Sequence, residues 1–308
     1  MERIYSKSNT ALVIILSLAM SGCESLLFHP SRSISVTPSF INIDYRDVYI
    51  DGETQNATIH AWFMQPVNPS HTANSTTRGH SLRLNSKTNG CVLVVHGNGG
   101  NITSTLPVAS WWTRQGYNVL AFDYQGYGLS SGVPSINAAL SDVDRAWRWL
   151  QEEPSCLDGQ RVVLGQSLGA VIAAAQFHRY IDTQTSQYLS ADFIILDSGF
   201  ASFNKIAREV AAKNIFTWGL QWLAPLLIPK TSNLQDNLTE LSTASKILVT
   251  HGKRDAIVSY RHFEQLKTHT KSSAAFYAYD GSHIELFSQK SGQDRVLQFM
   301  RHSSSLSD

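Results

Sequence analysis

The feature that most constrains this chain is a serine between two glycines, at the point where a strand gives way to a helix. Residues 161–164 are mostly apolar and predict a short buried strand, whereas residues 170–175 are mostly small and predict a tightly packed helix. Gly165 and Gly169 leave room around Ser167 for a turn that side chains would obstruct. Such a turn strains the backbone and lifts the hydroxyl clear of the sheet. Ser167 is therefore a candidate nucleophile, and an ordinary turn is the alternative.

The rest of the chain predicts a sheet covered by helices. From residue 91 onward, apolar runs alternate with helical patterns, which indicates a parallel sheet with helices on both faces. Residues 106–115 and 136–152 predict two of these helices, the second with apolar residues spaced by three or four. Residues 41–65 predict an antiparallel edge hairpin, and residues 66–90 predict an exposed polar loop.

A glycine-rich loop follows the apolar strand predicted at residues 91–95. The segment His96-Gly97-Asn98-Gly99-Gly100-Asn101 has little side-chain bulk, so its amide hydrogens can point to a site where negative charge develops. It lacks the ending of a phosphate loop and the spacing of a dinucleotide-binding motif. We expect an oxyanion hole formed by the amides of Asn98 and Leu168, with a plain turn as the alternative. His96 and His251 each precede a glycine at a strand end, where we expect structural hydrogen bonds.

The acid and the base follow Ser167 in the order serine, acid, histidine, which suits a nucleophile on this kind of turn. Asp255 lies on the loop after a late apolar strand, and Asp197, at the end of the preceding strand, is a rival acid. Of the 11 histidines, His283 lies on a short strand-to-helix loop downstream of the acid. We expect its imidazole to take the Ser167 proton while Asp255 orients it and stabilises the imidazolium.

These motifs resemble the α/β-hydrolase superfamily, in particular its small esterase-like and aminopeptidase-like members. The resemblance covers about residues 40–302, and the segments that carry it are residues 96–101, 123–128, 165–169, 251–255 and 281–283. It implies an α/β fold with a mostly parallel eight-stranded sheet, helices on both faces and a small helical cap. It also implies a serine-hydrolase mechanism that needs no cofactor. Residues 197–200 and 258–259 depart from the common pattern, which leaves the shapes of those two loops open.

Residues 204–243 interrupt the alternation of strands and helices. They contain an apolar run at residues 215–228 that is too apolar for a plain surface connection. By resemblance, this is the place where the superfamily inserts a cap over the nucleophile. We expect a cap that supplies an acyl-binding wall, and the alternatives are a helix packed into the core or a segment that dips into a membrane.

The N-terminus carries signals of export and anchoring. Basic residues precede an apolar run at residues 11–20, which is followed by Ser21-Gly22-Cys23, a pattern typical of a secretory signal. The run is shorter than the roughly 20 residues that span a bilayer. The cysteine after Ser-Gly resembles the lipobox of bacterial lipoproteins. We expect residues 1–22 to be removed and Cys23 to be lipidated, with ordinary secretion or an uncleaved anchor as alternatives.

These expectations divide the chain into three parts. Residues 1–22 are the signal peptide, residues 23–40 a lipidated tether, and residues 41–303 the α/β-hydrolase domain. Several acyl chains on one residue would anchor the protein stably. The residue after Cys23 is Glu24 and not an aspartate. By resemblance to enterobacterial sorting rules, we therefore expect the protein at the outer membrane, facing the periplasm.

Composition excludes several kinds of partner. The chain has 25 Lys and Arg against 24 Asp and Glu, so its net charge of +1 implies no nucleic-acid partner. No His and Cys cluster has metal-ligand spacing, so no metal is expected. The resemblance places Cys91 and Cys156 near the starts of neighbouring strands. An oxidising envelope would permit a disulfide between them, but we expect two separate buried thiols.

The sequence therefore predicts a membrane-anchored serine hydrolase that cleaves a carboxylic ester or related acyl bond of a small-molecule substrate through an acyl-enzyme. Two other functions stay open, because a fold does not establish an activity. A peptidase or amidase would differ in its leaving group and would need a pocket for a charged terminus. An envelope binding protein without catalysis would keep the fold alone.

Overall fold

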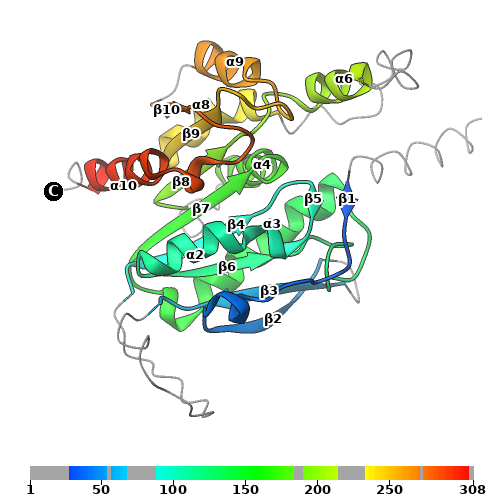
Figure 1. Ribbon diagram of the computed structural model, residues 1–308, viewed down its shortest axis with the longest axis vertical. Coiled ribbons are helices and arrows are strands. Elements are labelled where there is room, and N and C mark those ends of the chain that lie inside the picture. Colours follow the sequence, from blue (N-terminus) through cyan, green and yellow to red (C-terminus); the bar gives the residue numbers. More distant parts are fainter. Residues whose placement is uncertain are drawn as a thin grey trace, which may run out of the picture.

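The apolar segments pair into one eight-stranded sheet in a computed structural model that describes residues 28–53, 57–67, 88–183, 190–213, 233–270 and 273–304 (Figure 1). From edge to edge its strands are β10 (Ala275–Tyr279), β9 (Lys246–Gly252), β8 (Phe193–Asp197), β7 (Gln160–Gln166), β4 (Gly90–Val95), β6 (Tyr117–Phe122), β3 (Thr58–Met64) and β2 (Tyr45–Asp51). β3 is antiparallel to both of its neighbours, and the other neighbouring pairs are parallel. The predicted mostly parallel sheet and edge hairpin are confirmed.

The two faces of the sheet bury alternate residues, as β4 illustrates. Cys91, Leu93 and Val95 belong to one apolar core, whereas Val92 and Val94 belong to the other, because successive side chains of a strand point to opposite faces. The first core is covered by α3 (Ile136–Glu152), α4 (Leu168–Asp182), α8 (Leu234–Ala244) and α9 (Arg261–His269), and the second by α2 (Leu106–Arg114) and α10 (Lys290–Ser304) (Figure 1). The predicted helices on both faces are confirmed.

The predicted helix at residues 136–152 is confirmed with the same bounds, as α3. It begins after Ser135, whose hydroxyl accepts a hydrogen bond of 3.0 Å from the Ala138 amide and so caps the helix. Its apolar stripe, which the sequence spaces by three or four residues, is fully buried. Pro154 follows the helix and begins the 3-10 helix η5 (Pro154–Cys156).

The expected cap at residues 204–243 is described only at its two ends. α6 (Phe203–Lys213) begins it and α8 ends it, while residues 214–232, with the whole apolar run, lie outside the described residues. Leu234, Leu238 and Leu241 recur on one face of α8, and none is more than 1% exposed. They pack into the core beside α4. The end of the expected insertion is thus a core helix, while the apolar run for which a cap was expected lies outside the described residues.

The segment before the domain is also packed, although we expected a tether at residues 23–40. His29–Pro30 forms a short strand, β1, that pairs in parallel with β5 (Gly99–Gly100) (Figure 1). Phe28 is buried in the core, and η2 (Pro38–Ile41) precedes the edge hairpin. Residues 28–40 therefore belong to the folded domain, while Cys23 and residues 1–22 lie outside the described residues, as does most of the expected polar loop at residues 66–90. In the described ranges, every helix is too short or too polar to cross a membrane.

A disulfide joins Cys91 on β4 to Cys156 on η5, so the expectation of two separate thiols is wrong. Pairing of β4 with β7 brings the strand starts together, which places η5 beside Cys91. Both cysteines are buried, at 1% and 4% exposure. The bond closes a loop of 65 positions, which restricts the unfolded chain.

Loss of this disulfide should lower the free energy of unfolding. We expect the double variant Cys91→Ser, Cys156→Ser to lose about 2–5 kcal/mol, the usual effect of removing a native disulfide. Urea unfolding with and without dithiothreitol checks this, because the reductant should destabilise the wild type and leave the variant unchanged. Equal urea midpoints for the two proteins under oxidising conditions would contradict the expectation.

Candidate active site

Ser167 occupies the tight turn between β7 and α4 that the sequence predicts. Its backbone adopts φ 55° and ψ −118°, a conformation that serine avoids unless the surrounding structure imposes it. Gly169 packs against the neighbouring strand so closely that a Cβ there would lie 2.0 Å from the Val95 carbonyl oxygen. The Ser167 amide donates a hydrogen bond of 2.9 Å to the Asp197 carbonyl oxygen. The tight turn is thereby held by contacts with both neighbouring strands, β4 and β8.

The glycine-rich loop after β4 lies directly against this serine. A Cβ built on Gly97 would lie 3.3 Å from Ser167 Cβ. The His96 ring donates from Nδ1 to the Gly97 carbonyl oxygen at 2.7 Å. Because the peptide is trans, that bond turns the Asn98 amide hydrogen to the opposite side. Of the two predicted oxyanion donors, Asn98 follows Gly97, which lies against Ser167. Leu168 follows Ser167 at the N-terminus of α4, where amides lack helical partners.

His96 and His251 make structural hydrogen bonds, as the sequence predicts. Burial lowers the pKa of His96, so the ring is neutral and its Nδ1 hydrogen serves the Gly97 carbonyl. His251 donates from Nε2 to the Val258 carbonyl oxygen at 3.0 Å, and burial lowers its pKa as well. Both rings therefore shape loops around the site.

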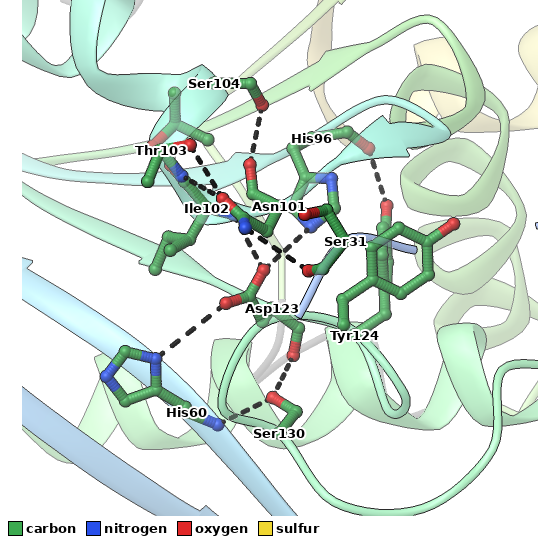
Figure 2. A network of polar contacts seen from close by, with 12 residues as sticks. Ser31, His60, His96, Asn101, Ile102, Thr103, Ser104, Asp123, Tyr124 and Ser130 are labelled. Carbon is green, nitrogen blue, oxygen red and sulfur yellow. Dashed lines mark hydrogen bonds and ion pairs between the residues drawn. The ribbon is translucent and has the colours of Figure 1, made fainter. Parts of the chain in front are cut away.

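A buried carboxylate, Asp123, anchors the glycine-rich loop from below (Figure 2). It follows β6, and its Oδ1 accepts a hydrogen bond of 2.7 Å from the Ile102 amide at the start of η4 (Ile102–Thr105). The His96 and His60 rings lie 3.6 Å and 3.8 Å from the same carboxylate. The sequence motifs assign no role to Asp123. The signal that marks it is a carboxylate directly after an apolar strand, in a segment rich in glycine and tyrosine.

The structure joins His283 to Asp255. His283 Nδ1 donates to Asp255 Oδ2 at 2.6 Å, while Asp255 Oδ1 accepts hydrogen bonds of 2.9 Å from the Ile257 and Val258 amides. Burial tends to raise the pKa of Asp255. The hydrogen bond and charge of His283, together with the two amides, outweigh that tendency and hold the pKa below its usual value. Asp255 is therefore an ionised partner that fixes the orientation of the His283 ring. It does so through Nδ1, so the bond does not occupy Nε2.

The rival acid, Asp197, has a different set of partners. Its Oδ1 accepts hydrogen bonds from Thr250 Oγ1 at 2.9 Å and from the Tyr279 hydroxyl at 3.1 Å. Complete burial raises its pKa to about 6, although the hydrogen bonds from its neighbours work against that rise. Ser198 and Tyr279, which both contact Asp197, accept hydrogen bonds of 3.1 Å from the Ile284 and Glu285 amides. Asp197 thus supports the loop that carries His283.

Parallel strand order brings these residues to one edge of the sheet. Ser167, Asp255 and His283 follow β7, β9 and β10, and the carboxyl ends of parallel strands meet at the same edge. Ser198 and Ile284 adopt φ values of 55° and 53°, so strained backbone gathers there too. Among the described residues, no hydrogen bond joins the Ser167 hydroxyl to His283, and catalytic contacts of this kind often tighten only when substrate binds.

Comparison with known proteins identifies a family and similar chains. The family model described as Hydrolase_4, serine aminopeptidase S33, matches residues 86–239. The uncharacterized protein YfhR of Escherichia coli K12 is 30% identical over 203 residues, which cover 65% of each chain. The lysophosphatidylserine lipase ABHD12 of Gallus gallus is 25% identical over 194 residues, covering 61% of this chain and 49% of that one. The matches thus span less than two thirds of either relative.

Solved structures share the fold over nearly the whole chain. The Pyrococcus furiosus esterase Pf2001 superposes with a TM-score of 0.62 at 20% sequence identity, covering 89% of this chain and 98% of that one. An alpha-beta hydrolase from Vibrio vulnificus gives a TM-score of 0.65 at 19% identity, covering 87% and 88% of the two chains. These structures support the predicted α/β-hydrolase fold.

Isosteric changes should separate the two acids. Asp255→Asn should lower turnover of an activated ester by roughly 10⁴-fold, because the amide cannot hold the reactive tautomer of His283. Asp197→Asn should lower turnover far less, since its amide oxygen can still accept from Thr250 and Tyr279. Steady-state kinetics of the two variants, prepared in parallel, checks the ranking. The reverse ranking would move the acid role to Asp197.

Proposed function

Because the chain belongs to the serine aminopeptidase S33 family of α/β-hydrolases, we propose that it is a serine hydrolase that cleaves a carboxylic ester or related acyl bond of a small molecule. The observation that carries this proposal is the strained Ser167 turn, which lies against the Gly97 loop. It shares its sheet edge with the hydrogen-bonded Asp255–His283 pair. Strain of this kind gathers at functional sites.

In the proposed mechanism, Ser167 Oγ attacks the acyl carbonyl carbon while His283 Nε2 takes the hydroxyl proton. Asp255 stabilises the resulting imidazolium through its bond to Nδ1. The amides of Asn98 and Leu168 donate to the oxyanion of the tetrahedral intermediate. Collapse breaks the bond to the alcohol, which receives the proton from His283. Water, deprotonated by His283, then attacks the acyl-enzyme, releasing the carboxylic acid and restoring Ser167.

An ester with an apolar acyl group suits this edge of the sheet better than a charged peptide terminus. Leu129 and Val133, on the loop after β6, are 54% and 69% exposed, and Ile257 beside Asp255 is 61% exposed. An esterase and a lipase among the similar proteins support the same choice. The family description as an aminopeptidase keeps amide cleavage as the second candidate. Rates on p-nitrophenyl esters of graded chain length and on aminoacyl p-nitroanilides distinguish the two.

A fluorophosphonate probe should label the wild type and leave Ser167→Ala unlabelled, because only an activated serine reacts quickly with it. Ser198→Ala is the matched control, since Ser198 is a serine of similar backbone conformation at the same edge, and this variant should still be labelled. Gel fluorescence after a short exposure measures the result. Equal labelling of the wild type and Ser167→Ala would overturn the mechanism.

The same proposal includes export and anchoring. Residues 1–22 would be removed, and the lipidated Cys23 would hold the enzyme in the bacterial cell envelope, at the outer membrane facing the periplasm. The lipobox-like Ser21-Gly22-Cys23 supports this destination. The Cys91–Cys156 disulfide supports an oxidising compartment. A single acyl chain anchors only marginally, so several chains on Cys23 would be needed.

Cys23→Ser should move the protein from the membrane pellet to a soluble or unprocessed pool, because serine offers no thiol for lipidation. The double variant Cys91→Ser, Cys156→Ser is the control and should stay in the pellet. Fractionation followed by intact-mass measurement reads out both location and lipid. A correctly cleaved Cys23→Ser protein that remains in the membrane would show that another element anchors it.

A further inference from the structure

The segment at residues 28–33, which we call the N-terminal strap, lies along the outer side of the glycine-rich loop. The Ser31 amide donates to the Gly100 carbonyl oxygen at 2.8 Å, and the Ser31 carbonyl oxygen accepts from Gly128 at 2.9 Å. The Asn101 side chain donates to the Ser31 and Ser33 carbonyl oxygens at 3.2 Å and 2.7 Å, and Figure 2 shows Asn101 beside Ser31. The strap is therefore hydrogen-bonded along the loop.

The strap also holds Asn98, the residue whose backbone amide would face the oxyanion. The His29 amide donates to Asn98 Oδ1 at 3.0 Å, and Asn98 Nδ2 donates to His29 Nδ1 at 3.2 Å. Both ends of the Asn98 side chain are thus paired with one residue of the strap. The Tyr127 hydroxyl completes the arrangement by donating to the Asn98 carbonyl oxygen at 2.7 Å. Phe28 packs against the edge of the same tyrosine ring.

Packing alone does not hold this part of the loop. Gly99 and Gly100 are exposed, and a Cβ built on either would meet no atom within 4 Å. Gly100 has φ 87°, and glycines without neighbours have wide conformational freedom. The hydrogen bonds from the strap therefore restrict a backbone that would otherwise move. This stretch of backbone begins directly after Asn98, the proposed oxyanion donor.

We propose that the N-terminal strap positions the oxyanion loop for catalysis, and that His29 is the positioning residue that holds Asn98. The inference rests on the proposed serine-hydrolase function. An oxyanion donor acts only when it is preorganised at the place where charge develops, so a loosened Asn98 peptide would stabilise the transition state less well. Substrate binding in the ground state would change little.

The strap also joins the catalytic loop to the proposed membrane anchor. Cys23 and Phe28 are five positions apart, so the chain between them reaches at most about 18 Å. An enzyme anchored through Cys23 would therefore hold its oxyanion loop close to the lipid surface.

The test compares His29→Ala with the wild type in the full-length protein. We expect kcat for an activated ester to fall roughly tenfold with KM unchanged, part of the 10²–10³-fold that loss of a whole oxyanion donor causes. The inhibition constant of an alkyl trifluoromethyl ketone, which forms a tetrahedral adduct, should rise by the same factor. Ser33→Ala is the matched control, because Ser33 lies in the strap with an exposed side chain, and its kcat should equal that of the wild type.

Two further variants separate positioning from stability. His29→Asn should recover most of kcat, because its side-chain oxygen can accept from Asn98 where the ring nitrogen did. In an Asn98→Ala background, His29→Ala should lower kcat little further, since the His29 side chain acts on the loop through its hydrogen bond with Asn98 Nδ2. Melting temperatures accompany every measurement. A loss of kcat that follows melting temperature and is not restored by His29→Asn would overturn the inference.

Failure of this inference is distinguishable from failure of the proposed function. Wild-type kcat and inhibitor affinity in His29→Ala would overturn the role of the strap and leave the hydrolase proposal intact. A wild type that neither hydrolyses the ester nor reacts with the fluorophosphonate would overturn both.

Discussion

The backbone strain at Ser167 is the constraint on which the rest of the site depends. A serine at φ 55° is unfavourable by about 1–3 kcal/mol and persists only when its surroundings determine it. Here the close packing of Gly169 on β4 and the hydrogen bond to the Asp197 carbonyl impose it. The parallel sheet supplies both contacts, because β4 and β8 are the two neighbours of β7. The sheet order therefore exposes the serine.

Two buried carboxylates outside the proposed chemistry hold loops at the same edge of the sheet as Ser167. Asp123 lies under the glycine-rich loop, and Asp197 supports the turn that carries His283. Each follows or ends a strand, so each occupies a place that the sheet makes rigid. Hydrogen bonds in such a low-dielectric interior are strong, which suits them to fix loop geometry. Asp197 resembles a catalytic acid in the sequence because structural and catalytic carboxylates occupy equivalent strand ends.

The N-terminal strap, residues 28–33, is a third support of these loops. Residues 28–33 lie within the expected tether, yet they pair with the loop that carries Asn98. Surface loops rich in glycine need such partners, because their own side chains provide little packing. The glycine-rich loop is thus held from below by the interior and from outside by the N-terminal strap. The proposed attachment at Cys23 and the geometry of the proposed catalytic edge would both depend on this segment.

The sequence by itself determined the strands, the bounds of α3 and the turn at Ser167, because periodicity and turn chemistry are local. Only the tertiary structure decided that His283 contacts Asp255, that Cys91 pairs with Cys156, and that α8 belongs to the core. It also decided that residues 28–40 pack on the domain. Each of these outcomes joins segments far apart in the chain. Their contacts depend on how the whole sheet and its helices pack, which no local pattern records.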